Sequence, residues 1–328
     1  MSVFDRDTTT DQVLAGIDLS GKRILITGTS SGLGRESARA LASKGASITL
    51  VARNSDKNEA AAAAIREQIP AADLETRVVD LSSLESIRSF ASDFLADHDR
   101  VDVLINNAGI MACPYSTSSD GYEMQLATNH LGHFLLTLLL APALINAGSS
   151  RVVVLSSGAH GMSGIDFEDP MFEHRPYDPW LAYGQSKTAN ALFALELDRR
   201  LGAQGVNAFS VHPGVIMTEL ARHMTEEVMA QMQVHVGARA AEGDTTPEEA
   251  ADTKLRFKSL EAGAATQLWA ATAAELAQHG GAYLADCQLG EVGGNVADAG
   301  VAAHARDAKA ANRLWSLSEE WVAQTLEC

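Results

Sequence analysis

The chain has 328 residues, of which 46% are hydrophobic and 20% charged. These values are ordinary for a globular protein with a sizeable core, and they argue against a disordered chain. The formal net charge of -17 argues against non-specific binding to nucleic acid or to anionic lipid. It leaves room for a nucleotide ligand, because a single phosphate needs only a local positive patch.

The sequence predicts neither a metal site nor a membrane span. Its three cysteines, Cys113, Cys287 and Cys328, are far apart and belong to no CxxC or Cys/His cluster. The N-terminal residues are polar and lack the apolar core of a signal peptide. The most apolar stretch, 131–145, is shorter than the roughly 20 residues that span a bilayer. We therefore expect a cytoplasmic protein in which this stretch is a buried central helix.

Short β-branched runs alternate with helical patterns along the chain, without internal repeats or a Pro- or Ser-rich linker. Fully apolar strands that alternate with helices are typical of a parallel sheet covered on both faces. We predict one doubly wound, Rossmann-type α/β domain over residues 1–328, with helices on both faces of a mainly parallel, seven-stranded sheet. The predicted strands are 24–27, 47–52, 76–80, 101–106, 151–156, 206–211 and 282–286.

A glycine-rich turn follows the first predicted strand. Residues 27–34 read Thr-Gly-Thr-Ser-Ser-Gly-Leu-Gly, and a helical pattern begins directly after them. Glycines permit the tight turn and let the backbone approach a pyrophosphate, whose charge is stabilised at a helix N-terminus. Because the turn lies between a strand and a helix at the start of a βαβ series, it predicts a dinucleotide site.

The end of the second predicted strand indicates which dinucleotide is bound. Residues 50–54 read Leu-Val-Ala-Arg-Asn, where an NAD-selective enzyme presents a carboxylate to the ribose 2′-hydroxyl. Arg53 could instead pair with a 2′-phosphate and stack on the adenine. We therefore expect NADP(H) in preference to NAD(H). The alternative is that Arg53 is only a solvated charge at the end of a strand.

Tyr183 and Lys187 are the candidate proton-transfer pair. They lie four residues apart in a helical pattern and therefore share a helix face. A nearby ammonium would lower the pKa of the phenol from about 10, which makes Tyr183 a candidate general acid and base. Ser157, at the end of an apolar strand, could hydrogen-bond the reacting oxygen. Asn129 could relay to Lys187 through water.

Two long connections do not fit the simple alternation of strands and helices. They cover residues 159–182 and 219–256, after the C-terminal ends of strands, where such sheets bind ligands. We interpret both as substrate-covering insertions, with surface decoration as the alternative. Four methionines lie in or just before the second insertion: Met217, Met224, Met229 and Met232. They indicate either an adaptable apolar pocket or simple core packing.

On these motifs the chain resembles the short-chain dehydrogenase/reductase family over about residues 20–290. The family's Asn-Asn-Ala-Gly is matched by 106–109, its Tyr-x3-Lys by 183–187 and its Pro-Gly by 213–214. The resemblance implies a catalytic set of Asn129, Ser157, Tyr183 and Lys187, and it favours Ser157 over Ser156. The residues that it implies for cofactor binding are Gly28, Ser30, Ser31, Gly32, Leu33, Gly34, Arg53, Asn54, Asp80, Leu81, Asn107, Ala108, Gly109, Tyr183, Lys187, Pro213, Gly214, Val215 and Thr218.

A narrower resemblance is to the retinol dehydrogenase branch of that family and its bacterial relatives. It rests on four segments: 129–134, 155–160, 182–190 and 210–215. That branch also has a long insertion between its serine and its tyrosine. Membrane-anchored members carry an apolar N-terminal segment, and this sequence departs from them there.

Together these features predict an NADP(H)-dependent oxidoreductase that interconverts an alcohol and a carbonyl on a lipophilic small molecule. We expect no nucleic-acid partner and no metal. By analogy with the family we expect a homodimer or homotetramer built on helices 122–145 and 183–202. Two alternatives stay open: a carbon–carbon double-bond reductase, and a non-catalytic NADP(H)-sensing protein. Such sensors typically lose the Tyr-x3-Lys pair, which this chain keeps.

Overall fold

An eight-stranded sheet in the order β3-β2-β1-β4-β5-β6-β7-β8 forms the centre of the protein. The structure is a computed structural model that describes residues 3–241, 257–296 and 299–326. Its strands are β1 (Arg23–Thr27), β2 (Ser47–Ala52), β3 (Leu74–Val78), β4 (Val103–Asn106), β5 (Ser150–Leu155), β6 (Val206–His212), β7 (Tyr283–Ala285) and β8 (Gln288–Leu289). Neighbours from β3 to β7 pair in parallel, whereas β8 pairs antiparallel with β7. The predicted doubly wound, mainly parallel sheet is confirmed.

The strand count differs from the prediction by one. The additional strand, β8, has two exposed residues, so it has no apolar pattern by which a sequence could reveal it. Strand β3 lies two residues earlier than predicted, because the chain pairs with β2 from Leu74 onward. A separate parallel pair consists of β9 (Glu291–Val292) and β10 (Gly300–Val301).

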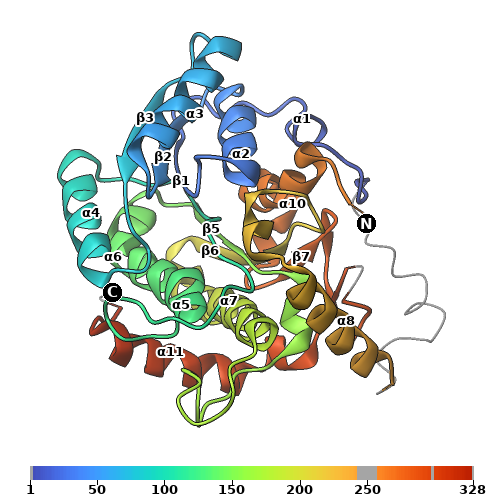
Figure 1. Cartoon of the computed structure of the whole chain (residues 1–328). Helices are drawn as coiled ribbons and strands as arrows, with labels where there is room; N and C mark the ends of the chain where they lie inside the picture. The colour runs from blue at the N-terminus through green and yellow to red at the C-terminus, as the bar shows by residue number, and fades with distance from the viewer. Residues whose placement is uncertain (1–2, 242–256, 297–298, 327–328) are drawn as a thin grey trace.

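Helices cover both faces of the sheet (Figure 1). Alternate residues of β1 point to opposite faces. Ile24 and Ile26 belong to one core cluster and Leu25 to the other. The first face is covered by α2 (Gly32–Ala42), α3 (Ser55–Gln68) and α10 (Leu260–Thr272), and the second by α4 (Leu84–Asp97), α6 (Gly132–Asn146) and α7 (Pro179–Leu201).

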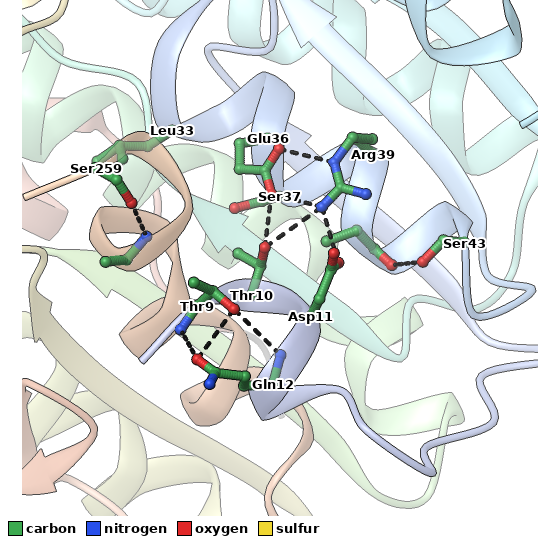
Figure 2. Close-up of polar contacts among 12 residues, drawn as sticks. Thr9, Thr10, Asp11, Gln12, Leu33, Glu36, Ser37, Arg39, Ser43 and Ser259 are labelled. Carbon is green, nitrogen blue, oxygen red and sulfur yellow. Dashed lines mark hydrogen bonds and ion pairs between the residues drawn. The ribbon is translucent and has the colours of Figure 1, made fainter. Parts of the chain in front are cut away.

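A short N-terminal helix, α1 (Thr10–Val13), fastens α2 from outside the sheet (Figure 2). The Thr10 hydroxyl donates to Glu36 Oε1 at 2.6 Å, and Glu36 is itself buried on α2. Arg39 forms ion pairs with Glu36 and, on α1, with Asp11. These contacts hold the helix whose N-terminus follows the glycine-rich turn.

The most apolar helical run of the described chain is Met124–Asn146, which comprises α5 (Met124–Leu126), a π-helical turn (Ala127–Leu131) and α6. By length and composition alone it could cross a membrane, but 78% of its most apolar window is buried inside the protein. Burial of this kind is typical of the central helix of a globular fold.

The C-terminal helix α11 (Ala308–Val322) packs along α7 and the π-helical turn (Figure 1). Trp315 lies edge-on to Phe134, with 4.9 Å between ring centroids, and Ser318 hydrogen-bonds His130 at 2.9 Å. Phe134 and His130 lie in segment 122–145, and α7 contains most of segment 183–202. These are the two helical segments that the sequence predicted as subunit contacts. A second subunit could reach this part of them only by displacing α11.

Candidate active site

The glycine-rich turn between β1 and α2 has the tight geometry that its sequence predicts. Gly28 and Gly32 have φ values of +75° and +59°, in the left-handed region that favours glycine. A Cβ on Gly34 would clash with the carbonyl oxygen of Gly28. Asn107 Nδ2 donates to Thr27 O at 2.7 Å. The predicted cofactor residue Asn107 therefore uses its side chain to brace the turn.

A cleft of about 250 Å³ opens at the N-terminus of α2, between Ser31, Gly32 and Thr218. The Ser31 side chain occupies the N-cap position without a capping hydrogen bond. The first backbone N–H groups of an α-helix have no partner within the helix, so they can bind a phosphate. The donor set of this cleft therefore fits a dinucleotide. Ser30 and Leu33, also predicted here, are half-buried in the same turn.

The residues predicted for the adenosine end follow β2 and β3. Arg53 is exposed, and no described residue forms a hydrogen bond or ion pair with its side chain. Asn54 is already occupied as the N-cap of α3, accepting from Lys57 N at 2.8 Å. Asp80 accepts from the Ser82 hydroxyl at 2.6 Å, and its neighbour Leu81 is buried. Arg53 is thus the free donor of this group.

The loop after β4 joins the glycine-rich turn to the predicted catalytic residues. A Cβ on Gly28 would lie 2.8 Å from Ala108 Cα, so this loop touches the glycine-rich turn. A Cβ on Gly109 would lie 3.1 Å from Asn129 Oδ1 and 3.7 Å from Lys187 Nζ. The structure therefore brings these predicted residues together from four separate parts of the chain.

Asn129 lies in the π-helical turn. Its Oδ1 accepts from Ile110 N at 2.9 Å, and its Nδ2 donates to Ile110 O at 3.0 Å and to Ser186 Oγ at 2.9 Å. Single π-helical turns are frequent at functional sites. The Asn129 amide thus binds the residue next to Lys187 in the chain, and no hydrogen bond between Asn129 and Lys187 is found in the described part of the protein.

A hydrogen-bonded chain that the sequence did not reveal links this turn to β1. The Thr27 hydroxyl accepts from Asn107 N and Ala108 N at 3.0 Å and lies 2.9 Å from His133 Nε2. His133 Nδ1 lies 3.0 Å from Asn129 O, which can only accept, so the ring donates there. Burial lowers the pKa of His133 to about 4, which keeps the ring neutral.

Tyr183 and Lys187 are both buried on α7, and Ser157 lies two residues after the C-terminal end of β5. Lys187 Nζ donates to Leu155 O at 3.0 Å and lies 5.6 Å from the centroid of the Tyr183 ring. Burial raises the pKa of Tyr183 to about 12, partly opposed by a hydrogen bond with Ser157, and lowers that of Lys187 to about 7. The predicted lowering of the tyrosine pKa by the lysine is therefore absent, because desolvation acts on both groups.

The two neighbouring serines have different partners. Ser157 hydrogen-bonds Tyr183 and accepts from Ala159 N at 3.2 Å. Ser156 is buried and donates to Lys187 O at 2.8 Å. Ser157 therefore lies beside the phenol of Tyr183, whereas the Ser156 hydroxyl binds the backbone of α7.

An apolar cluster covers Tyr183. It contains Trp180 and, partly buried, Met111, Met162, Met224, Val228 and Met232. The last three come from α8 (Glu226–Ala241) and the turn before it, within the second predicted insertion. The rest of that insertion, 242–256, lies outside the described residues. Of the other two methionines singled out in the sequence, Met217 is 71% exposed and Met229 42%.

The first predicted insertion divides into two parts. Its first turn, the 3-10 helix Gly158–Met162, reaches the cluster over Tyr183. Residues Ile165, Phe167 and Met171 instead pack against a cluster formed by α7 and α11. The sequence did not reveal Met111 and Met162 as site residues, because they lie in two separate loops and belong to no motif.

The loop after β6 closes the cleft. Gly214 has a φ of +90°, and a Cβ there would lie 2.8 Å from the Lys258 side chain. The predicted residue Val215, two positions after Pro213, pairs with Phe257. Lys258, which lines the cleft and forms an ion pair with Asp286, was missed because no motif surrounds it. Within the described ranges no cluster of three or more His, Cys, Asp or Glu could hold a metal.

Comparisons with known proteins agree with this geometry. The family of short chain dehydrogenases matches residues 22–229. A Streptomyces lividans protein described as a probable oxidoreductase is 43% identical over 318 residues, which cover 94% of this chain and 99% of that one. Human retinol dehydrogenase 12 is 40% identical over 304 residues, or 93% and 87% of the two chains.

Among solved structures, one from Mycobacterium paratuberculosis, of an uncharacterized protein, has a TM-score of 0.73 and 35% sequence identity. The similarity covers 98% of this chain and 100% of that one. The similarity in sequence and the similarity in fold thus both extend over nearly the whole chain.

Proposed function

The chain belongs to the short-chain dehydrogenase/reductase family, in its retinol dehydrogenase-like part, and is an oxidoreductase of a family that uses a nicotinamide cofactor. We propose that it interconverts an alcohol and a carbonyl on a lipophilic small molecule, with NADP(H) as its cofactor. The proposal rests above all on the buried pair Tyr183 and Lys187, with the half-buried Ser157 beside the phenol and an apolar cluster over it.

Tyr183 is the proposed general acid and base. In the reducing direction its hydroxyl gives a proton to the carbonyl oxygen, and the Ser157 hydroxyl donates a hydrogen bond to the same oxygen. A phenol whose pKa is about 12 retains its proton until a more basic alkoxide forms, so it suits the acid role. The bound nicotinamide supplies or accepts the hydride.

Lys187 and Asn129 are proposed to support Tyr183. The Lys187 ammonium faces the loop after β4, near Gly109, where it can hold the ribose hydroxyls of the nicotinamide end. Asn129 fixes Ile110 in that loop and Ser186 on α7 with one amide group. It thereby sets the distance between the loop and the helix that carries the proton donor.

The free guanidinium of Arg53 supports NADP(H) in preference to NAD(H). It stands where a carboxylate would repel a 2′-phosphate, and it has no partner among the described residues that would have to be displaced. Phosphates would be held by the first turn of α2, with Thr218 across the cleft.

The cover over Tyr183 supports a lipophilic substrate. Its side chains are methionines, a valine and a tryptophan, which present apolar and adaptable surface to a ligand. We also propose a cytoplasmic location. If the protein is a homo-oligomer, its contacts lie outside the part of α7 that α11 covers.

The proposal is tested with purified protein, NADPH and a panel of aldehydes, ketones and enones. NADPH oxidation with an alcohol as product supports it. Saturation of the enone carbon–carbon bond alone would instead indicate a double-bond reductase. Tight NADPH binding, measured by calorimetry, with no turnover of any panel member would indicate a cofactor-sensing protein.

A further inference from the structure

Asp178 joins the helix that carries Tyr183 to the helix that covers it. One carboxylate oxygen, Oδ1, accepts from Trp180 N at 2.9 Å and Leu181 N at 3.0 Å, and so caps the N-terminus of α7. The other, Oδ2, lies 3.0 Å from His235 Nε2 on α8. A single side chain therefore fixes two elements that are separated by 57 residues.

A second contact joins the same two helices. Trp180 Nε1 donates to Val228 O on α8 at 2.7 Å. Val228 and His235 are seven residues apart, about two helical turns, so both lie on one face of α8. Met224 and Met232 pack over Tyr183 beside Val228. The opposite face carries Met229 and Val234, which are exposed.

Both contacts of α8 are made to the first turn of α7, directly before Tyr183. The side chains of His235 and Asp178 are 23% and 27% exposed, so water screens their attraction in part. In the described chain Asp178 is the one carboxylate that pairs with His235. The position of α8 above the phenol thus depends on one polar pair, one tryptophan and a few methionines.

We propose that His235 and Asp178 are positioning residues, whose bond holds α8 over Tyr183 and thereby tightens the site around large apolar substrates. This rests on the proposed function, in which Tyr183 acts on a lipophilic carbonyl. A small carbonyl compound gains little contact area from the cover, whereas a long one gains much. The bond should therefore act on the Michaelis constant of the large substrate.

The test compares His235→Ala and His235→Gln with the unmodified protein, using NADPH with propanal and with decanal. Because both side chains are partly exposed, His235→Ala should raise KM for decanal about two- to tenfold, with kcat and the KM for propanal nearly unchanged. His235→Gln keeps an N–H donor and should restore most of the loss. Hydrogen exchange of residues 226–235 should be faster in His235→Ala than in the unmodified protein.

The matched control is His98→Ala. His98 Nε2 lies 3.0 Å from Glu75 Oε2, the same separation, but at the β3 edge of the sheet. The His98→Ala variant should change neither the KM for decanal nor the hydrogen exchange of residues 226–235. Equal KM increases for both aldehydes, or unchanged exchange in His235→Ala, would overturn the proposal. If the unmodified protein reduces no carbonyl compound, the proposed function fails, while the exchange measurement still decides whether His235 holds α8.

Discussion

The proposed cofactor side and the proposed substrate side of the site are built in different ways. On the cofactor side, Thr27, Asn107, Asn129 and His133 each make two or more hydrogen bonds, mostly to the backbone. On the other side, two polar contacts join α8 to α7 among the described residues, and apolar side chains pack beside them.

Fixed geometry is needed where phosphates bind, and less so where an apolar ligand is covered. Backbone donors and glycines must match phosphates within tenths of an ångström, and buried hydrogen bonds hold such positions. Methionine side chains have three rotatable bonds and adapt to irregular apolar shapes. The comparison predicts sharp losses from small changes on the first side and tolerance on the second.

The largest effect is expected from Tyr183→Phe. Removal of the proposed proton donor should lower kcat by about 10²–10⁴, while NADPH affinity stays nearly unchanged. Steady-state kinetics and calorimetry on the same preparation check both halves. A loss of less than tenfold would remove Tyr183 from the general acid role.

The adjacent serines offer the next test, because they differ in their partners and not in their chemistry. Ser157→Ala should lower kcat by roughly 10²–10³, as expected for a donor to the reacting oxygen. Ser156→Ala should mainly lower the free energy of unfolding, by about 1 kcal/mol, through the lost bond to Lys187 O. Kinetics and thermal unfolding would contradict this assignment if they ranked the two variants the other way.

Arg53→Ala should weaken NADPH binding by roughly 10- to 150-fold, the value of a charged hydrogen bond, and leave NADH binding nearly unchanged. Arg35→Ala is the control, since Arg35 is an exposed arginine on α2 itself. Calorimetry with both cofactors decides the matter. Equal losses for NADPH and NADH would show that Arg53 does not recognise the 2′-phosphate.

Lys187→Met should stabilise the fold while it abolishes turnover. Burial lowers the pKa of Lys187 from 10.5 to about 7, so folding disfavours its charged form. Between these values the unfolded chain binds more protons, and the stability of the unmodified protein rises with pH. Leu155 O keeps a donor in the variant, Asn190 Nδ2 at 2.8 Å.

At pH 7 and below, the melting temperature of Lys187→Met should therefore exceed that of the unmodified protein by roughly 2–4 °C. The advantage should fade as the pH rises toward 10.5. Thermal unfolding at several pH values measures it. An advantage that grew with pH would contradict the burial argument.

The smallest effect is expected from Met224→Leu, in the cover. Exchange of one apolar side chain for another of similar volume should cost less than about 1.5 kcal/mol, or less than roughly tenfold in decanal KM. Met229→Leu, at an exposed position of the same region, should change nothing measurable. A larger loss at Met224 would show that the cover is as exacting as the cofactor side.

Much of the fold is readable from short segments. Apolar β-branched runs predicted the seven parallel strands, since buried strands of a parallel sheet need little alternation. The glycine-rich turn predicted its own geometry because left-handed φ values at Gly28 and Gly32 are a local requirement. Two residues four apart on a helix must share a face, so the spacing of Tyr183 and Lys187 is enough to pair them.

Other features depend on contacts between distant segments. The π-helical turn at Asn129 goes with bonds to Ile110 and Ser186, and no local pattern distinguishes it from an ordinary helix. Which methionines lie at the site also depends on the folded chain. Met111 and Met162 pack with Met224 and Met232 over Tyr183, whereas Met217 faces solvent.

Three features could be predicted from the amino-acid order alone: the doubly wound sheet, the glycine-rich turn and the family of the chain. Each depends on the propensities and spacings of a few neighbouring residues. The protonation of the site depends instead on the folded chain, since the pKa values of Tyr183 and Lys187 follow from burial that no neighbour in sequence provides. The cover depends on it too, because the pairing of Asp178 with His235 depends on how the chain folds back over 57 residues.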